Sequence, residues 1–250
     1  MNKNDLFNSI FFPRPSFIEK SEDDHLIDVE RKVQVGVSFF LKDKKYPNIL
    51  FFHGNAELAQ EYNEIANLFN QHNCNFIVSD YRGYGLSNGT PTKENLHLDA
   101  SIIFSYISSF IQENNYLGKM VIMGRSLGSA SACEIISKHS NDIDGCIIES
   151  GFATEKPLLE MFNINPSDID YNESDGFQNL NKLKCYSKPL LIIHAELDHI
   201  IPIDEARIMH AETNSNKKEL WEIPNANHND ILMHAQKDYF IKIENFINSI

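Results

Sequence analysis

A serine placed between two glycines is the pattern in this sequence that most directly suggests chemistry. Gly124-Arg125-Ser126-Leu127-Gly128 follows the apolar run 120–123 and opens a segment with helical spacing. A serine on a sharp strand-to-helix turn needs very small neighbours two residues away, and the turn exposes its hydroxyl beside a helix N-terminus, whose dipole favours developing negative charge. The pattern therefore predicts that Ser126 is a nucleophile.

A serine hydroxyl is a weak nucleophile and needs a base within hydrogen-bond reach, itself held by an acid. Of the ten histidines, His228 lies on a loop between the last predicted strand and the final predicted helix. The others fall on predicted helices or strands, precede the nucleophile, or adjoin the candidate acid. His228 is therefore the predicted base.

The predicted acid is Asp198, which follows the apolar strand 190–194 and precedes a turn that carries an apolar pair and a proline. Glu149 is an alternative, because it ends the preceding strand and could also reach the histidine. Glu196 is the nearest rival in sequence, but it lies earlier, where strand side chains still pack.

A second glycine turn follows the apolar run 48–53 and predicts a site for a negatively charged oxygen. Gly54 lets the backbone approach a substrate oxygen, so the N–H of Asn55 is one predicted oxyanion donor and the N–H of Leu127 is the other. His53 is expected to brace this loop. Arg82, in a glycine turn after the next strand, is interpreted as a structural anchor, with substrate contact as the alternative.

The elements that must position these residues alternate between short apolar runs and longer amphipathic segments. This alternation is typical of a mostly parallel sheet with helices on both faces, so the fold class is α/β and residues 1–250 form one domain. Strands are predicted at 33–41, 48–53, 75–79, 120–123, 146–148, 190–194 and 220–223, and helices at 57–71, 94–113, 127–139, 204–213 and 230–248.

Two segments interrupt this alternation. Residues 1–24 are polar and irregular and are expected to form an arm packed on the domain, with a weak membrane or partner contact as the alternative. Residues 153–188 are longer than an ordinary connection and rich in Asn, Asp and Pro. Since ligands of open α/β sheets bind beyond the carboxyl ends of the strands, this insertion is expected to form a small cap over the site, rather than surface decoration.

Composition excludes several classes of function. A formal net charge of −13 argues against a nucleic-acid partner, which needs a basic face, and against adhesion to anionic membranes by charge alone. No apolar run is long enough for stable membrane insertion. The four cysteines follow no metal-ligand spacing, so no metal is predicted and a reducing cytoplasm is the favoured location; they are Cys74, Cys133, Cys146 and Cys185.

Taken together, the motifs resemble the α/β-hydrolase superfamily in both order and spacing. The likeness covers residues 25–250 and is greatest to small serine hydrolases that include eukaryotic protein depalmitoylases and bacterial esterases. The motifs are HGNA at 53–56, DYRGYGLSNG at 80–89, GRSLGSA at 124–130, LDHIIP at 197–202 and HND at 228–230. The depalmitoylases carry an N-terminal cysteine cluster for membrane attachment, which this chain lacks.

The resemblance implies hydrolysis of an ester or thioester in a small-molecule or acylated substrate, through an acyl-enzyme and without a cofactor. A peptidase or amidase of the same fold is one alternative, and a non-catalytic binding protein is another. A haloalkane dehalogenase is disfavoured, because it needs a carboxylate nucleophile where this chain has Ser126.

Overall fold

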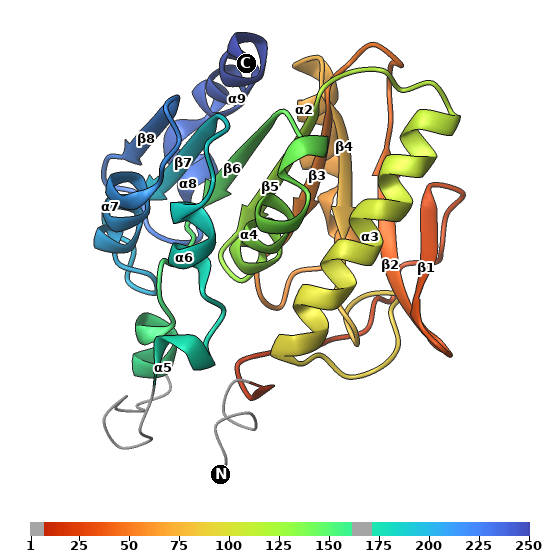
Figure 1. Cartoon of the computed structure of the whole chain (residues 1–250). Coiled ribbons are helices and arrows are strands. Elements are labelled where there is room, and N and C mark those ends of the chain that lie inside the picture. The colour runs from red at the N-terminus through yellow and green to blue at the C-terminus, as the bar shows by residue number, and fades with distance from the viewer. Residues whose placement is uncertain (1–7, 162–171) are drawn as a thin grey trace.

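One continuous sheet of eight strands organises the computed structural model, which describes residues 8–161 and 172–250 (Figure 1). The strand order is β1-β2-β4-β3-β5-β6-β7-β8; β2 is antiparallel to both of its neighbours and all other pairs are parallel. The strands are β1 (Asp24–Glu30), β2 (Val33–Phe40), β3 (Asn48–Phe52), β4 (Asn75–Ser79), β5 (Met120–Arg125), β6 (Gly145–Glu149), β7 (Leu190–Ala195) and β8 (Lys218–Ile223).

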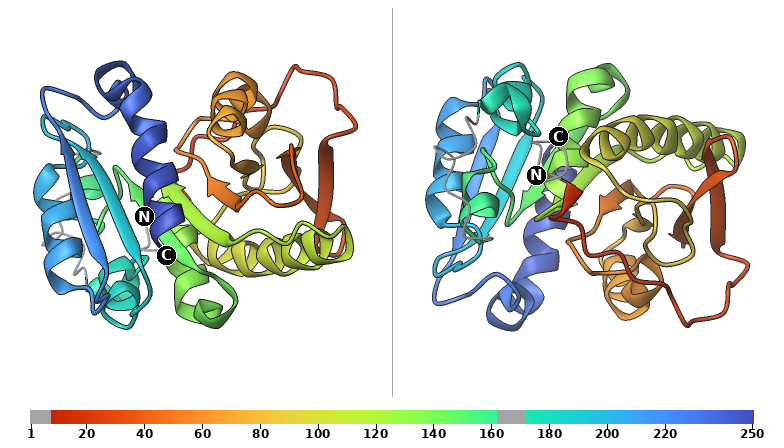
Figure 2. Two further views of the ribbon diagram at one scale, coloured as in Figure 1. Left: turned by 90° about the horizontal axis from the view of Figure 1, so that it is seen from above. Right: turned by 90° about the horizontal axis from the view of Figure 1, so that it is seen from below.

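Helices cover both faces of this sheet (Figure 2). On one face α3, α4, α6 and α7 pack over one apolar core, and on the other α2, α8 and α9 pack over a second. The helices are α2 (Asn63–Gln71), α3 (Lys93–Glu113), α4 (Gly128–Lys138), α5 (Lys156–Met161), α6 (Asn179–Lys184), α7 (Ile203–Glu212), α8 (Ile231–Ala235) and α9 (Lys237–Ser249), with 3₁₀ turns at Ala59–Tyr62, Ser140–Asp142 and Glu173–Asp175.

The central strands are unbroken apolar runs because each is buried on both faces. In β3, Leu50 and Phe52 point into the first core, while Ile49 and Phe51 point into the second. All five residues of β3 and all six of β7 are buried. This is the pattern expected for strands that lie between two layers of helices, and it confirms the predicted fold class.

Several elements differ from the sequence predictions. The predicted helix 57–71 is a 3₁₀ turn at Ala59–Tyr62 followed by α2, and α5 and α6 were not predicted. Strand β1 was not predicted, although its burial alternates between the two sides as in a half-exposed edge strand. The predicted final helix, 230–248, is broken into α8 and α9 at Gln236, whose φ of 49° no α-helix accommodates.

The described part of the N-terminal arm packs on the domain. Pro15 bridges to Gly85, and the Phe12 N–H donates to the side chain of Asn55 at 3.0 Å. The predicted cap, 153–188, contains α5 and α6, but residues 162–171 lie outside the described residues, as do residues 1–7 of the arm. The cap therefore stays a prediction.

Candidate active site

Ser126 occupies the sharp turn between β5 and α4. Its φ is 51°, in the left-handed region. A side chain on Gly124 would place its Cβ 2.4 Å from the carbonyl oxygen of Gly128, and one on Gly128 would come 1.9 Å from the carbonyl oxygen of Phe52. Both glycines are therefore required for helix α4 to lie this close to the sheet.

The structure brings Ser126, His228 and Asp198 into a single chain of hydrogen-bond contacts. His228 Nε2 lies 3.1 Å from Ser126 Oγ, and His228 Nδ1 lies 2.7 Å from Asp198 Oδ2. All three residues are at most 7% exposed. The three side chains come from loops after β5, β7 and β8, which meet at the carboxyl edge of the sheet, as the sequence predicted.

Asp198 is firmly held and stays ionised. Its Oδ1 accepts hydrogen bonds from the N–H groups of Ile200 at 2.9 Å and Ile201 at 2.8 Å. Burial alone would raise the pKa of Asp198, but the hydrogen bond from His228 and the further bonds outweigh it, so the pKa is lowered. An ionised acid at this position favours the His228 tautomer that carries its proton on Nδ1, leaving Nε2 free to accept from Ser126.

The alternative acids are occupied elsewhere. Glu149 accepts from Arg125 Nε at 3.1 Å and from the hydroxyl of Tyr239. Glu196 accepts from the N–H of Asn225 at 2.8 Å. Of the acids considered from the sequence, the structure thus places only Asp198 against the imidazole ring.

The loop after β3 is fixed by the side chain of Asn55, and its backbone is left available. Asn55 Oδ1 accepts from the Tyr84 hydroxyl at 2.6 Å, and Asn55 Nδ2 donates to the Ile10 carbonyl at 2.6 Å. Neither the N–H of Asn55 nor that of Leu127 donates to another group of the described chain. Both residues line the same cavity as Ser126 and can therefore serve as the predicted pair of oxyanion donors.

His53 and Arg82 lie away from this cavity. His53 is fully buried, with its ring nitrogens 2.7 Å from the Gly54 carbonyl oxygen and 3.0 Å from Asp80 Oδ1, so it braces the loop. Arg82 donates two hydrogen bonds to Asp99 on α3, at 2.7 and 2.8 Å. This is the structural role predicted for Arg82, in place of substrate contact.

The cavity over Ser126 has a volume of about 200 Å³ and is mostly apolar. Ile10 and Phe12 of the arm form part of its wall, and Leu158 and Met161 of α5 form another part. Nothing in the sequence places the arm at the site, because its apolar residues show no regular period. We call this space the catalytic cavity.

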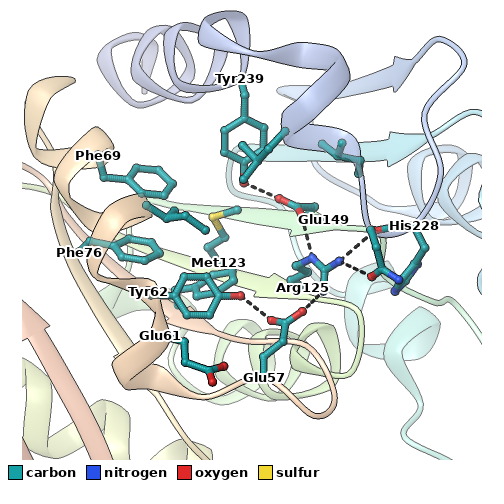
Figure 3. A pocket seen from close by; sticks show the side chains of 15 residues that line it. Glu57, Glu61, Tyr62, Phe69, Phe76, Met123, Arg125, Glu149, His228 and Tyr239 are labelled. Atoms are coloured by element: carbon teal, nitrogen blue, oxygen red, sulfur yellow. Dashed lines mark hydrogen bonds and ion pairs between the residues drawn. The ribbon is translucent and has the colours of Figure 1, made fainter. Parts of the chain in front are cut away.

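A buried arginine beside the nucleophile is the main site feature that the sequence analysis missed (Figure 3). Arg125 Nη2 donates to the His228 carbonyl at 2.9 Å and to Asn229 Oδ1 at 3.1 Å, and Nη1 donates to Glu57. Glu57 also accepts from the N–H of Gly54 at 2.8 Å. Together with its bond to Glu149, Arg125 thus ties the loops after β3 and β8 to the end of strand β6, and we call this set of contacts the Arg125 bridge.

Comparison with known proteins agrees with this architecture. Residues 43–165 match a family model described as serine aminopeptidase, S33. The chain is 28% identical over 202 residues to alpha/beta hydrolase domain-containing protein aho-3 of Caenorhabditis elegans, covering 80% of this chain and 57% of that protein. It is 32% identical over 189 residues to an uncharacterized membrane protein of Saccharomyces cerevisiae, covering 72% and 62%. The chain thus spans about three-fifths of the length of these relatives.

Among solved structures, an esterase of Pyrococcus furiosus superposes with a TM-score of 0.73, covering 95% of this chain and 98% of that one at 16% identity. At this identity the likeness concerns the fold. The chain therefore has the α/β-hydrolase fold and is similar in sequence to alpha/beta hydrolase domain-containing proteins.

Two features are absent from the described residues, 8–161 and 172–250. Within these ranges no helix combines the length and the apolar character needed to cross a membrane. Nor do the described His, Cys, Asp and Glu side chains gather anywhere in a group of three or more suited to hold a metal ion.

Proposed function

We propose that this protein hydrolyses carboxylic esters or thioesters through an acyl-enzyme on Ser126. The observation that carries the proposal is the contact chain from Ser126 Oγ through the His228 ring to Asp198, with distances of 3.1 and 2.7 Å. This geometry is the one in which a neutral imidazole can remove a proton from a serine hydroxyl.

In the first half of the reaction Ser126 Oγ attacks the acyl carbonyl carbon as its proton passes to His228 Nε2. The negative charge that forms on the carbonyl oxygen is held by the N–H groups of Asn55 and Leu127. The bond to the leaving group then breaks, and His228 returns the proton to the departing alcohol or thiol. Asp198 stabilises the imidazolium throughout without taking its proton.

In the second half, water attacks the acyl-enzyme with His228 again as base. The new acid departs and Ser126 recovers its proton. The buried position of the three side chains supports this sequence, because low solvent exposure strengthens the hydrogen bonds that hold developing charge.

The second candidate is an aminopeptidase, which the description of the matched family model favours. An aminopeptidase needs an anion to hold the substrate's ammonium group. Glu57 lines the catalytic cavity, but its carboxylate already accepts from Arg125, Tyr62 and the N–H of Gly54. The site therefore favours an uncharged acyl group, and we place ester and thioester cleavage first.

Turnover of matched substrates tests whether the protein prefers esters and thioesters to aminopeptidase substrates. Butyryl esters of 4-nitrophenol, a butyryl thioester and alanyl-4-nitroanilide would be compared on the wild type and on Ser126→Ala. We expect turnover of the ester or thioester, loss of at least about 10³-fold in Ser126→Ala, and little cleavage of the anilide. Preferred cleavage of the anilide would establish the aminopeptidase instead, and retained turnover in Ser126→Ala would exclude Ser126 as nucleophile.

A further inference from the structure

A second cavity lies behind the Arg125 bridge, on the face of the sheet covered by α2, α8 and α9 (Figure 3). Its volume is about 260 Å³, and we call it the rear cavity. A cavity of about 150 Å³ lined by Leu, Ile and Phe binds benzene, so this one has room for a larger group. Most of its wall is apolar and includes Phe51, Ile65, Phe69, Phe76, Met123 and Leu232.

The polar side chains at one end of the rear cavity already have hydrogen-bond partners within the protein. The guanidinium of Arg125 donates to Glu57, Glu149, Asn229 and the His228 carbonyl. The two carboxylates are completed by tyrosine hydroxyls, Tyr62 on Glu57 and Tyr239 on Glu149. Figure 3 shows these groups directed at one another across the end of the cavity.

Charge at this end is also balanced. Burial would raise the pKa of Glu57, but the Arg125 charge and the hydrogen bonds outweigh it and lower the pKa, so Glu57 is the anion that matches Arg125. For Glu149 burial prevails and the pKa is raised. At the rim Glu61 forms an ion pair with Arg14. A charged ligand would lose its hydration here without gaining an opposite charge, which selects for an uncharged, apolar occupant.

The rear cavity adjoins the catalytic cavity. Glu57, Arg125, His228 and Asn229 line both cavities, so the Arg125 bridge is their common wall. Asn229, at the outer edge of this wall, is exposed. An acyl chain attached to Ser126 would have to pass the bridge at Asn229 to reach the space in front of Phe69 and Phe76.

We propose that the rear cavity is a subsite for an uncharged, apolar part of the substrate, such as the alkyl chain of an acyl group. This proposal rests on the ester or thioester hydrolysis proposed above. It assigns the substrate class: an ester with an apolar chain long enough to reach from Ser126 across the Arg125 bridge. Charged and short acyl groups do not use this subsite.

Substitutions that fill the rear cavity test the proposal. Ile65→Trp fills it from α2 and Leu232→Trp from α8; both residues are partly buried, so the variants are expected to fold, which circular dichroism would check. Leu68→Trp is the matched control, because Leu68 lies on α2 at 39% exposure and outside the cavity wall. The ratio of kcat/KM for 4-nitrophenyl octanoate to that for 4-nitrophenyl acetate would be measured for each protein.

We expect a wild-type ratio above one that falls by at least about tenfold in Ile65→Trp and Leu232→Trp, and that Leu68→Trp leaves unchanged. A direct binding measurement accompanies this one. The uncharged fluorophore N-phenyl-1-naphthylamine should bind Ser126→Ala and lose at least about tenfold in affinity when Ile65→Trp is added, but not when Leu68→Trp is added.

The outcomes separate the subsite from the proposed function. Normal ester turnover with the same chain-length ratio in all four proteins would overturn the subsite and leave the hydrolase intact. Absence of turnover of any ester or thioester would overturn the proposed function, and the substrate role of the cavity with it. Equal fluorophore binding in the filled and control variants would overturn the cavity as an apolar binding site.

Discussion

Ser126 is held in a backbone conformation that is unfavourable for any residue with a side chain. Its φ of 51° costs about 1–3 kcal/mol, which the surrounding sheet and helix must offset. The strain is useful, because the same turn raises the hydroxyl to within 3.1 Å of His228 Nε2. Part of the stability of the fold is therefore given up for the position of one oxygen atom.

This strain predicts different stabilities for two inactive variants. Ser126→Gly removes the side chain and relieves the backbone, whereas Ser126→Ala removes only the hydroxyl. We expect Ser126→Gly to be about 1 kcal/mol more stable than Ser126→Ala, against the usual cost of introducing glycine. Urea denaturation measures the difference; an alanine variant as stable as the glycine variant would show that the turn is not strained.

The choice of acid gives a second prediction at this scale. Asp198→Asn keeps the shape of the side chain but favours the wrong tautomer of His228, so we expect kcat to fall by about 10⁴-fold. Glu149→Gln is the control, since Glu149 contacts Arg125 and Tyr239 and not the imidazole. We expect kcat of Glu149→Gln to fall by less than about a hundredfold. Similar losses in both variants would contradict the assignment of Asp198.

The sequence predicted the residues of the contact chain because each is tied to a local pattern. Ser126 has its glycines, and Asp198 and His228 directly follow strands. Arg125 and Glu57 were missed for a physical reason. Their roles depend on contacts between residues that are far apart in the sequence. Arg125 lies 68 residues from Glu57 and 24 residues from Glu149, and no local pattern predicts either contact.

At the scale of elements, the Arg125 bridge connects the loops after β3 and β8 with the end of strand β6. Its guanidinium is 14% exposed and makes bonds in several directions, which a lysine ammonium cannot reproduce in the same geometry. Arg125→Lys should therefore loosen the loop that carries His228, lowering kcat by about tenfold or more and the free energy of unfolding by about 2 kcal/mol.

Arg207→Lys is the matched control for this prediction. Arg207 also donates to two acidic side chains, Glu222 and Asp204, but it is half exposed on α7 and lines neither the catalytic cavity nor the rear cavity. Exposed ion pairs contribute little to stability. Kinetics and urea denaturation of both variants should show loss only in Arg125→Lys, and equal behaviour would mean that the bridge does not position the loop.

The helices and strands themselves were largely predictable. The central strands are apolar throughout and α3 has a clear N-cap, with Thr92 accepting from the N–H of Asn95 at 3.1 Å. The break of the final helix at Gln236 was not predictable, because neither a glycine nor a proline marks it. Asp230 directly precedes α8, but its side chain accepts from the N–H of Asn227 at 2.6 Å instead of capping the helix.

At the scale of the whole molecule, the helices on one face are linked by a histidine that stays neutral. His97 on α3 accepts from Lys182 on α6 at 3.2 Å, and Lys182 also pairs with Glu134 on α4 at 2.7 Å. Burial and the neighbouring Lys182 charge lower the pKa of His97 to about 3, from 6.5 in the unfolded chain.

This shift predicts how stability depends on pH. Below pH 6.5 the unfolded chain binds a proton at His97, and the folded protein does not until about pH 3, so acidification favours unfolding in this range. Relative to His97→Gln, the wild type should lose about 1.4 kcal/mol of unfolding free energy per pH unit well below pH 6.5. Urea denaturation at pH 7, 6, 5 and 4.5 measures this, and parallel curves would contradict it.

The overall architecture followed from the sequence because the alternation of apolar runs and amphipathic helices admits few arrangements. The position of the N-terminal arm could not be predicted from the sequence. Its place at the catalytic cavity depends on single contacts, such as that of Ile10 with the Asn55 side chain, 45 residues away. Edge strand β1 was not predicted either. It is half exposed, so few of its residues need to be apolar.

The most direct test of the central claim is the intact mass of the protein after reaction with a small fluorophosphonate, which labels an activated serine whatever the natural substrate. We predict one adduct on the wild type, located by peptide mapping to Ser126, and none on Ser126→Ala. A folded wild type that gains no adduct, or a Ser126→Ala variant that gains the same one, would contradict the assignment of Ser126 as an activated nucleophile.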